Sequence, residues 1–171
     1  LREKLLRPRV LYELAARSAA AVRGTAARLL VNDRADIARA AGADGVHLAT
    51  RSLDAATVRR VFGPGFLVGV SAHTFEEARD AREGGADFAL FGPVFDTPSK
   101  RAYGPPVGLE RLGEAARALA PFPVLAIGGV TRENFPETLG AGARGVAAIR
   151  LLGDPRSLRE VVDEIKRARL R

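Results

Sequence analysis

The sequence contains no cysteine and only two histidines among its 171 residues. Without cysteine the chain has no disulfides, thiol nucleophiles or cysteine-ligated metals, and two histidines argue against a histidine-rich metal site. No apolar run approaches the roughly 18 residues of a membrane span. The first ten residues lack the apolar core and cleavage site of a signal peptide. These absences predict a cytoplasmic protein without a membrane partner.

The chain is strongly basic, with a formal net charge of +7. A basic surface can serve nucleic acid, an acidic membrane or an anionic metabolite. Here the positive residues, mostly arginine, are spread along the whole chain without a polybasic block, and aromatic residues make up only 6%. This distribution argues against nucleic acid as a partner and is equally typical of a soluble, arginine-rich surface.

One short pattern of small residues occurs three times along the chain, at residues 41–46, 84–89 and 141–146. Each copy follows a helix-like stretch and precedes a short apolar run. Glycine at such a point is typical of a helix C-cap, where the backbone turns left-handed. The apolar run is typical of a strand buried on both faces. The repeat therefore predicts a unit of helix, glycine turn and buried strand.

Extending this unit along the chain predicts seven strands. They are Leu1–Lys4 (the end of a strand only), Arg28–Asn32, Gly45–Leu48, Phe66–Val70, Phe88–Phe91, Val124–Ile127 and Gly145–Ile149. Helices are expected at Pro8–Val22, Asp54–Phe62, Thr74–Gly84, Leu109–Ala120, Arg132–Leu139 and Pro155–Leu170. This alternation predicts a parallel sheet, either open and doubly wound or closed into a barrel.

The residues after the strands distinguish these two architectures. Polar residues follow nearly every strand, as in a barrel, whereas an open sheet concentrates them near one switch point. Neither a Gly-x-Gly-x-x-Gly fingerprint nor a Walker A loop is present. We therefore predict a single α/β domain over residues 1–171, a (β/α)8 TIM barrel without its first β/α unit, holding strands two to eight. The first unit could be truncated, disordered or supplied by another chain, and an exposed seam would favour a homo-oligomer.

Two segments near the C-terminal end are candidates for binding phosphate. Gly128 and Gly129 end an apolar strand, where exposed backbone N–H groups can approach a phosphate. The alternative is a tight turn required only for packing. Arg150 follows the predicted strand, and its planar guanidinium suits phosphate, although it could also be an ordinary surface arginine. We predict that Gly128, Gly129, Ile149 and Arg150 bind phosphate.

The stretch from Asp96 to Pro106 is rich in Thr, Pro, Ser and Gly, and loops of this length are often binding elements. Within it, Thr97 and Ser99 could present two hydroxyls beside the ammonium of Lys100. Such a group suits a diphosphate or a carboxylate. The alternative for Lys100 is a solvated side chain.

Charged and amide side chains also mark the first two predicted strands. Arg2 and Lys4 alternate on a strand and so share one face, where an anionic ligand or Asp33 could be their partner. Asn32 and Asp33 end the next strand. The alternative is that Asp33 and Arg34 only cap a helix.

Seven motifs, in this order and at this spacing, carry a resemblance to a known superfamily. They are Leu1–Lys4, Leu30–Arg34, Gly42–Leu48, Gly69–Thr74, Phe91–Phe95, Thr97–Lys100 and Ala126–Val130. On these motifs the chain resembles the thiamine phosphate synthase and TenI-like thiazole tautomerase superfamily, from residue 1 to about residue 154. The resemblance implies that the absent segment is the family's first strand and helix. It also implies a small phosphorylated thiazole as ligand.

The resemblance implies one of two activities. The synthase joins a hydroxymethylpyrimidine diphosphate to a thiazole phosphate with Mg²⁺, whereas the tautomerase aromatises a thiazole carboxylate phosphate by proton transfer and needs no cofactor. For Mg²⁺ the synthase pattern implies Asp33 and a second acid, but Ser52 stands at the second position, and Asp54 is expected to cap a helix. Arg150 stands where synthases usually carry serine. We therefore expect the tautomerase, with the synthase as the alternative and a non-catalytic phosphate-binding barrel as a further alternative.

A tautomerase needs a group that exchanges protons near neutral pH, and imidazole is suited to this. His73 lies just past the predicted strand that ends at Val70, and the resemblance implies that this position is catalytic. The alternative is a histidine that only hydrogen-bonds the loop, and His47 is expected to be a buried, hydrogen-bonded core residue. The expected substrate-binding residues are Arg2, Lys4, Asn32, Asp33, Ser71, Thr97, Ser99 and Lys100.

Overall fold

The computed structural model describes residues 1–97 and 105–169, which form an α/β fold of seven helices and six strands. Ser99 and Lys100 lie outside the described residues, so their predicted roles have no structural test. No described helix is long and apolar enough to cross a membrane. Strands and helices alternate, as the sequence predicts, and every strand pairing within the two units below is parallel.

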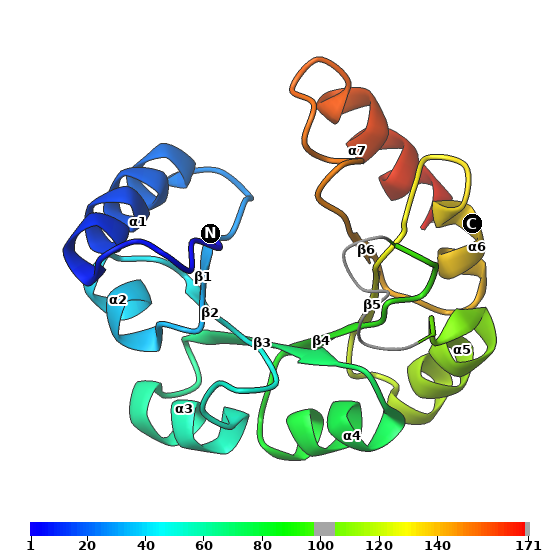
Figure 1. Ribbon diagram of the computed structural model, residues 1–171, viewed down its shortest axis with the longest axis horizontal. Helices are drawn as coiled ribbons and strands as arrows, with labels where there is room; N and C mark the ends of the chain where they lie inside the picture. The colour runs from blue at the N-terminus through cyan, green and yellow to red at the C-terminus, as the bar shows by residue number, and fades with distance from the viewer. Residues whose placement is uncertain (98–104, 170–171) are drawn as a thin grey trace. The chain divides into compact units, whose positions relative to one another are not determined.

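The chain divides into two compact units. The first comprises Leu1–Ser71 and Glu83–Asp87, and the second comprises Ala72–Arg82 and Phe88–Arg171. Within each unit the helices lie on one face of the strands (Figure 1). The prediction of one domain over residues 1–171 stays a prediction.

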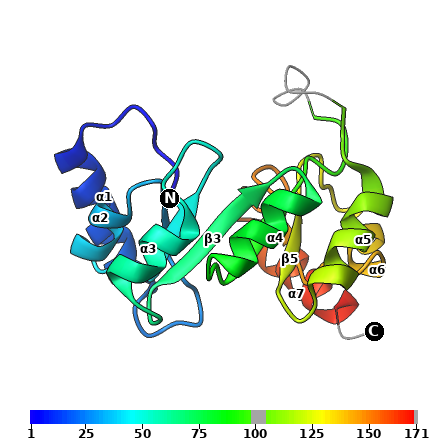
Figure 2. The same ribbon diagram turned by 90° about the horizontal axis from the view of Figure 1, so that it is seen from below.

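The first unit is built on three strands that pair in sequence order. They are β1 (Leu30–Asn32), β2 (Gly45–Leu48) and β3 (Leu67–Ala72, with its last residue in the second unit). Its helices α1 (Pro8–Val22), α2 (Ala35–Ala40) and α3 (Ala55–Phe62) pack on these strands (Figure 2). Val31, Val46 and Val68 lie in register on the three strands and are fully buried. Burial of such side chains is the main favourable contribution to folding here.

The second unit repeats this plan. Its strands are β4 (Phe88–Phe91), β5 (Val124–Ile127) and β6 (Val146–Ala147). Its helices are α4 (Phe75–Glu83), which ends at the boundary with the first unit, α5 (Gly108–Leu119), α6 (Phe135–Gly140) and α7 (Leu158–Ala168). Ala89 pairs with Val124, and Ala126 with Val146. Ala89, Ala126 and Leu112 of α5 are fully buried in one apolar cluster.

The threefold repeat has a structural explanation. Its glycines adopt left-handed φ values of 71°, 82° and 111° at Gly42, Gly85 and Gly142, which confirms the predicted helix-ending turn. In the first copy, Asp44 Oδ2 accepts a hydrogen bond from the Leu29 N–H at 2.8 Å. In the second copy, Asp87 Oδ2 accepts from the Val68 N–H at 2.6 Å. The aspartate therefore satisfies a backbone donor at the start of the preceding strand.

Four strand boundaries differ from the prediction. The predicted Arg28–Asn32 strand begins only at Leu30. At the N-terminus only Leu1 joins the sheet, through its nitrogen to Leu30 O at 2.6 Å and its carbonyl to the Asn32 N–H at 2.8 Å. Arg2 and Lys4 are exposed and lie outside any strand, so the prediction that they share a strand face is wrong. Alternating residue types alone did not reveal where the backbone leaves the sheet.

The other two differences move residues expected at strand ends. The predicted Phe66–Val70 strand starts one residue later and continues to Ala72, which places Ser71 inside β3. The predicted Gly145–Ile149 strand is reduced to Val146–Ala147, and Ile149 lies in a turn with 84% of its surface exposed. The expectation of a buried strand that runs directly into Arg150 is therefore wrong. The composition of an apolar run predicts a strand, but the strand forms only where a neighbouring backbone pairs with it.

The helix boundaries agree with the prediction more closely than the strand boundaries do. The bounds of α1 are those predicted, and α3, α4 and α5 each shift by a residue or so at an end. In contrast, α7 starts at Leu158 rather than Pro155. Likewise α6 starts at Phe135 rather than Arg132, because residues 132–134 form a turn. In that turn Asn134 Oδ1 accepts the Thr131 N–H at 2.8 Å. This side-chain contact replaces the first turn of the predicted helix.

Candidate functional site

The end of β1 carries an unusual backbone. Asp33 has a φ of 66° and is the one non-glycine residue in the left-handed region among the residues that the structure describes. Its N–H donates to His47 O at 2.8 Å, which extends the pairing of β1 with β2. Aspartate tolerates this conformation better than most residues, and such strain often occurs at functional positions.

The Asp33 side chain is exposed, and its carboxylate has no hydrogen bond or ion pair with any other described residue. The alternative role as a helix cap does not apply, because Arg34 is the N-cap of α2 and no side chain caps that helix. Arg34 instead pairs with Asp36, at 2.9 and 2.6 Å, and the pKa of Asp36 is lowered by this hydrogen bond. Within this part of the structure, Asp33 is therefore a carboxylate available to a ligand.

His47 and Ser71 lie on neighbouring strands of the first unit. His47 Nε2 is 2.8 Å from Ser71 Oγ, and both side chains are half-buried. Burial lowers the pKa of His47 to about 4, and the positive charge of Arg2 acts in the same direction. At neutral pH the imidazole is therefore uncharged, and it fixes the position of the Ser71 hydroxyl. This agrees with the expectation of a hydrogen-bonded core histidine.

The loop after β2 does not contain a second acid for a metal. Ser52 Oγ accepts a hydrogen bond from the Ala49 N–H at 2.8 Å, so the hydroxyl closes a turn. Asp54 caps α3, as predicted, by accepting the Thr57 N–H at 2.6 Å and the Thr57 hydroxyl at 3.0 Å. Within residues 1–97 and 105–169, no group of three or more acidic or histidine side chains could hold a metal.

His73 follows β3 directly and belongs to the second unit. Its Nδ1 lies 2.5 Å from the Gly92 carbonyl oxygen, and its main-chain N–H donates to Glu77 Oε2 at 2.6 Å. A carbonyl oxygen only accepts, so Nδ1 must carry the proton in this contact. In the neutral ring Nε2 is then the unprotonated nitrogen, the atom that could take up a proton. The same contacts also hold the loop, so the loop-binding alternative and the catalytic one both remain open.

Gly128 and Gly129 both have left-handed backbones, with φ values of 94° and 67°. A Cβ on Gly128 would lie 2.5 Å from Pro93 Cα, and one on Gly129 would lie 2.7 Å from Phe95 Cβ. In addition, the Phe95 N–H donates to Gly128 O at 3.0 Å. Packing against the segment after β4 therefore accounts for both glycines, which was the alternative to a role in phosphate binding. The two roles are compatible, because this close contact also fixes the loop at the end of β5.

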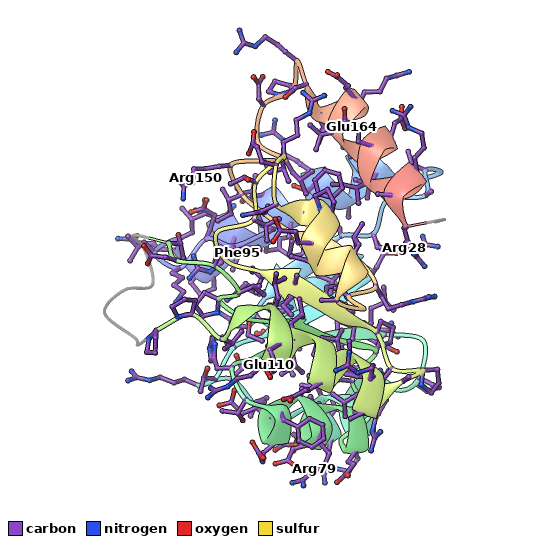
Figure 3. The ribbon with its side chains drawn as sticks, turned by 90° about the vertical axis from the view of Figure 1, so that its right-hand side faces the viewer. Arg28, Arg79, Phe95, Glu110, Arg150 and Glu164 are labelled. Carbon is purple, nitrogen blue, oxygen red and sulfur yellow. The ribbon has the colours of Figure 1, made fainter. Side chains whose placement is uncertain are left out.

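Thr97 and Arg150 complete the predicted set within the second unit. Thr97 is only 7% exposed, so its hydroxyl is buried. Arg150 is exposed in the turn after β6, and its side chain extends away from α6 and α7 (Figure 3). No described acidic side chain pairs with Arg150, which leaves its guanidinium available to an anion.

The sequence prediction missed two side chains that hold the loop after β5. Asn134 Nδ2 donates to Gly129 O at 3.1 Å, while its Oδ1 accepts the Thr131 N–H. Arg132 binds Glu160 and Glu164 of α7. The Thr131–Asn134 contact has a local signal, since Thr and Asn here stand three residues apart just before a helix. The Arg132 pairs span about 30 residues of sequence and have no local signal.

Comparison with known proteins places the chain in a family. Residues 1–152 match the family model described as thiamine monophosphate synthase. The chain belongs to this family, which confirms the resemblance seen in its motifs. A relative in Geobacter sulfurreducens, provisionally named a thiamine-phosphate synthase, is 50% identical over 91% of this chain and 73% of its own length.

Two further relatives agree with this family. The thiamine-phosphate synthase of Chlorobium luteolum is 44% identical over 87% of this chain and 70% of its own length. Among solved structures, a thiamine phosphate pyrophosphorylase from Pyrococcus furiosus is 31% identical, with a TM-score of 0.83 over 96% of this chain and 81% of that chain. These names favour the synthase alternative over the tautomerase that we expected from Ser52 and Arg150.

Proposed function

We propose that the protein is a thiamine-phosphate synthase, a transferase that joins a hydroxymethylpyrimidine diphosphate to a thiazole phosphate. The observation that carries this proposal is the 50% identity, over 91% of the chain, to a relative that bears a synthase name. In this reaction a C–N bond forms between the methylene carbon of the pyrimidine and the thiazole nitrogen, the C–O bond from that carbon to the diphosphate breaks, and diphosphate leaves. The reaction needs groups that hold two phosphorylated substrates and stabilise the departing negative charge.

We propose that the fold is a (β/α)8 barrel, in which Leu1 ends strand two and β1–β6 are strands three to eight. The support is the TM-score of 0.83 to the Pyrococcus furiosus enzyme over 96% of the chain. In such barrels the polar residues that follow the strands face one common mouth. In the first unit, Asn32 ends β1, Asp33 follows it, and Ser71 lies near the end of β3. In the second unit, His73 follows β3. A homo-oligomer stays a prediction.

A magnesium ion fits this chain only in a particular way. Mg²⁺ is often bound through one or two carboxylates together with oxygens of a substrate phosphate. Asp33 supplies one exposed carboxylate at the end of β1, free of other described partners, whereas Ser52 is engaged in a turn. Asp33 would therefore hold Mg²⁺ that arrives with the diphosphate. When bound, the ion would neutralise charge on the leaving diphosphate.

The chain's own residues divide the remaining tasks. The Gly128–Gly129 loop and the turn with Ile149 and Arg150 are assigned to the thiazole phosphate, with Arg150 as the cation. Ser71, positioned by His47, offers a hydroxyl to the substrate. The other proposed substrate-binding residues are Arg2, Lys4, Asn32 and Thr97, with Ser99 and Lys100 from the segment outside the described residues.

The proposal is tested by product analysis of the protein incubated with both substrates, with and without Mg²⁺. Mass spectrometry should detect thiamine phosphate only when Mg²⁺ is present. A parallel sample contains thiazole carboxylate phosphate without metal and tests the tautomerase. Conversion in that sample alone would favour the tautomerase, for which the supporting observation is the orientation of His73, whose Nδ1 lies 2.5 Å from the Gly92 carbonyl oxygen. Binding of thiazole phosphate without either conversion would favour a non-catalytic barrel.

A further inference from the structure

An ion-pair cluster in the second unit has no role in the function proposed so far. We call Arg132, Glu160 and Glu164 the Arg132 clamp. Arg132 Nη2 lies 2.5 Å from Glu160 Oε1 and also contacts Glu164 Oε1, while Nε lies 2.9 Å from Glu164 Oε2. One guanidinium thus binds both carboxylates, and it does so bidentately with Glu164. Glu164 lies on α7 and is labelled in Figure 3.

The two acids are arranged for a shared cation. Glu160 and Glu164 are four residues apart on α7, a spacing at which like charges repel each other and destabilise a helix. Arg132 between them converts this repulsion into attraction. The hydrogen bond from Arg132 lowers the pKa of Glu164, and the bonds to Glu164 and Glu160 raise the pKa of Arg132. Arg132 and Glu164 therefore each stabilise the charged form of the other.

The contribution of this cluster to the stability of the fold is expected to be small. The Arg132 side chain is 44% exposed and that of Glu160 is 61% exposed. Exposed ion pairs contribute little to folding, because water and salt screen them and long side chains lose freedom. Such pairs can still fix the geometry of the backbone segments that carry them, in particular when the guanidinium binds bidentately.

The clamp joins two segments that carry proposed phosphate-binding residues. Arg132 lies three residues after Gly129 in a turn that Asn134 closes through Gly129 O. On the other side, the turn with Arg150 leads into α7 through consecutive turns, in which the Gly153 N–H donates to Arg150 O and the Leu158 N–H to Asp154 O. Glu160 is the third residue of α7. Arg132 therefore ties the glycine loop to the start of the helix that follows Arg150.

We infer that Arg132 is a positioning residue for the substrate phosphate, which holds the Gly128–Gly129 loop and the Arg150 turn at a fixed separation. This inference rests on the proposed assignment of the phosphate to these two segments. Phosphate recognition by a rigid loop and a guanidinium depends on their separation, because both groups reach the same phosphate only when they are held in the right geometry. Loss of the clamp should therefore weaken phosphate-bearing thiazole ligands selectively.

The test compares Arg132→Met with a matched control, Arg9→Met. Arg9 pairs with Glu13 at 3.1 Å on α1, so the control also removes an exposed arginine from an ion pair. The double variant Glu160→Gln with Glu164→Gln keeps Arg132 and removes its partners. Calorimetry gives the affinity for thiazole phosphate and for the dephosphorylated thiazole alcohol, and thermal unfolding is followed in parallel. If the protein converts its substrates, KM for each substrate and kcat are also measured.

Arg132→Met and the double glutamine variant should each lower the affinity for thiazole phosphate roughly tenfold. The affinity for the alcohol should change less than about twofold. KM for thiazole phosphate should rise by a similar factor, while KM for the pyrimidine diphosphate and kcat stay nearly constant. Arg132→Lys, which can still bind one glutamate, should fall in between. Arg9→Met should leave all these values unchanged.

The inference is overturned if Arg132→Met binds thiazole phosphate as tightly as the unaltered protein. It is equally overturned if both ligands weaken together with a fall in the unfolding temperature, because that result indicates a structural role only. The binding arm does not depend on turnover. The unaltered protein could make no thiamine phosphate, while Arg132→Met selectively lowers the affinity for thiazole phosphate. In that case the synthase proposal fails and the clamp inference stands. An unaltered protein that does not prefer the phosphorylated thiazole contradicts the clamp inference itself.

Discussion

The two units hold their candidate functional groups by different physical means. In the first unit, hydrogen bonds between strand ends position them, with the Asp33 N–H on His47 O and His47 Nε2 on Ser71 Oγ. In the second unit, close backbone packing and ion pairs position them, as at Gly129 and Arg132. The first arrangement presents a carboxylate and a hydroxyl, whereas the second presents glycine backbone and a cation. The proposed function therefore places Mg²⁺ at the carboxylate of the first unit and the thiazole phosphate at the glycine loop and Arg150 of the second.

The largest expected effect follows substitution of a packed glycine. In Gly129→Ala the new Cβ would lie 2.7 Å from Phe95 Cβ and 2.8 Å from Asp96 O, on a backbone with a φ of 67°. Strain and overpacking together should lower the free energy of unfolding by about 3 kcal/mol. Gly24→Ala is the control, because Gly24 has a φ of 79° but nothing within 4 Å of the new Cβ. It should cost only about 1 kcal/mol. Equal losses in urea unfolding would show that close packing at Gly129 does not matter.

The next effect concerns Asp33 and tests whether the first unit binds Mg²⁺. Asp33→Asn keeps a side chain that tolerates the left-handed backbone, so the stability should hardly change. It removes the carboxylate assigned to Mg²⁺ and should lower Mg²⁺-dependent kcat/KM roughly hundredfold. Titration of Mg²⁺ in the presence of diphosphate, followed by calorimetry, measures the binding directly. Unchanged Mg²⁺ dependence in Asp33→Asn would remove Asp33 from the metal site.

A smaller effect is expected at the exposed cation of the second unit. Arg150→Ala should weaken the binding of thiazole phosphate by about 1.5–3 kcal/mol, since a charge-assisted hydrogen bond is lost. The dephosphorylated alcohol should bind as before. Equal weakening of both ligands would show that Arg150 does not contact the phosphate.

The smallest expected effect concerns the pH dependence of stability. The unfolded His47 imidazole takes up a proton near its ordinary pKa of about 6.5, whereas burial keeps the folded group neutral down to about pH 4. Between these values the unfolded state binds more protons, so stability falls as the pH falls. The loss should be on the order of 1–2 kcal/mol for this half-buried ring. In His47→Gln the difference in unfolding free energy between pH 6.5 and pH 4 should shrink by that amount. The same pH slope in both proteins would contradict the shifted pKa.

The parts of the fold that sequence predicted are those with local signals. Pro8 at the start of α1 and the glycine turns at Gly42 and Gly85 each depend on residues only a few positions apart. The cap formed by Asp54 was predicted for the same reason. The departure of the backbone from the sheet after Leu1 and the shortness of β6 depend on which backbone lies alongside, which composition does not contain.

The candidate site shows the same division. Gly128, Gly129 and Asp33 were selected by type and by position after a strand, and the structure explains their backbone conformations. The Arg132 clamp went unnoticed, because its partners are 28 and 32 residues away and are exposed glutamates of an ordinary kind. The preference for the tautomerase rested on Ser52 and Arg150, two positions that differ from the synthase pattern. These two positions weighed less than the 50% identity, over 91% of the chain, to a relative with a synthase name.

The most direct test of the proposed function is a ³¹P NMR time course of the protein with thiazole phosphate, pyrimidine diphosphate and Mg²⁺. A synthase must release one diphosphate for each thiazole phosphate that it consumes. The proposed function predicts that the diphosphate signal grows in this ratio and that Asp33→Asn slows it strongly. Spectra in which both substrates stay unchanged, while the same protein tautomerises thiazole carboxylate phosphate without Mg²⁺, would contradict the proposed function.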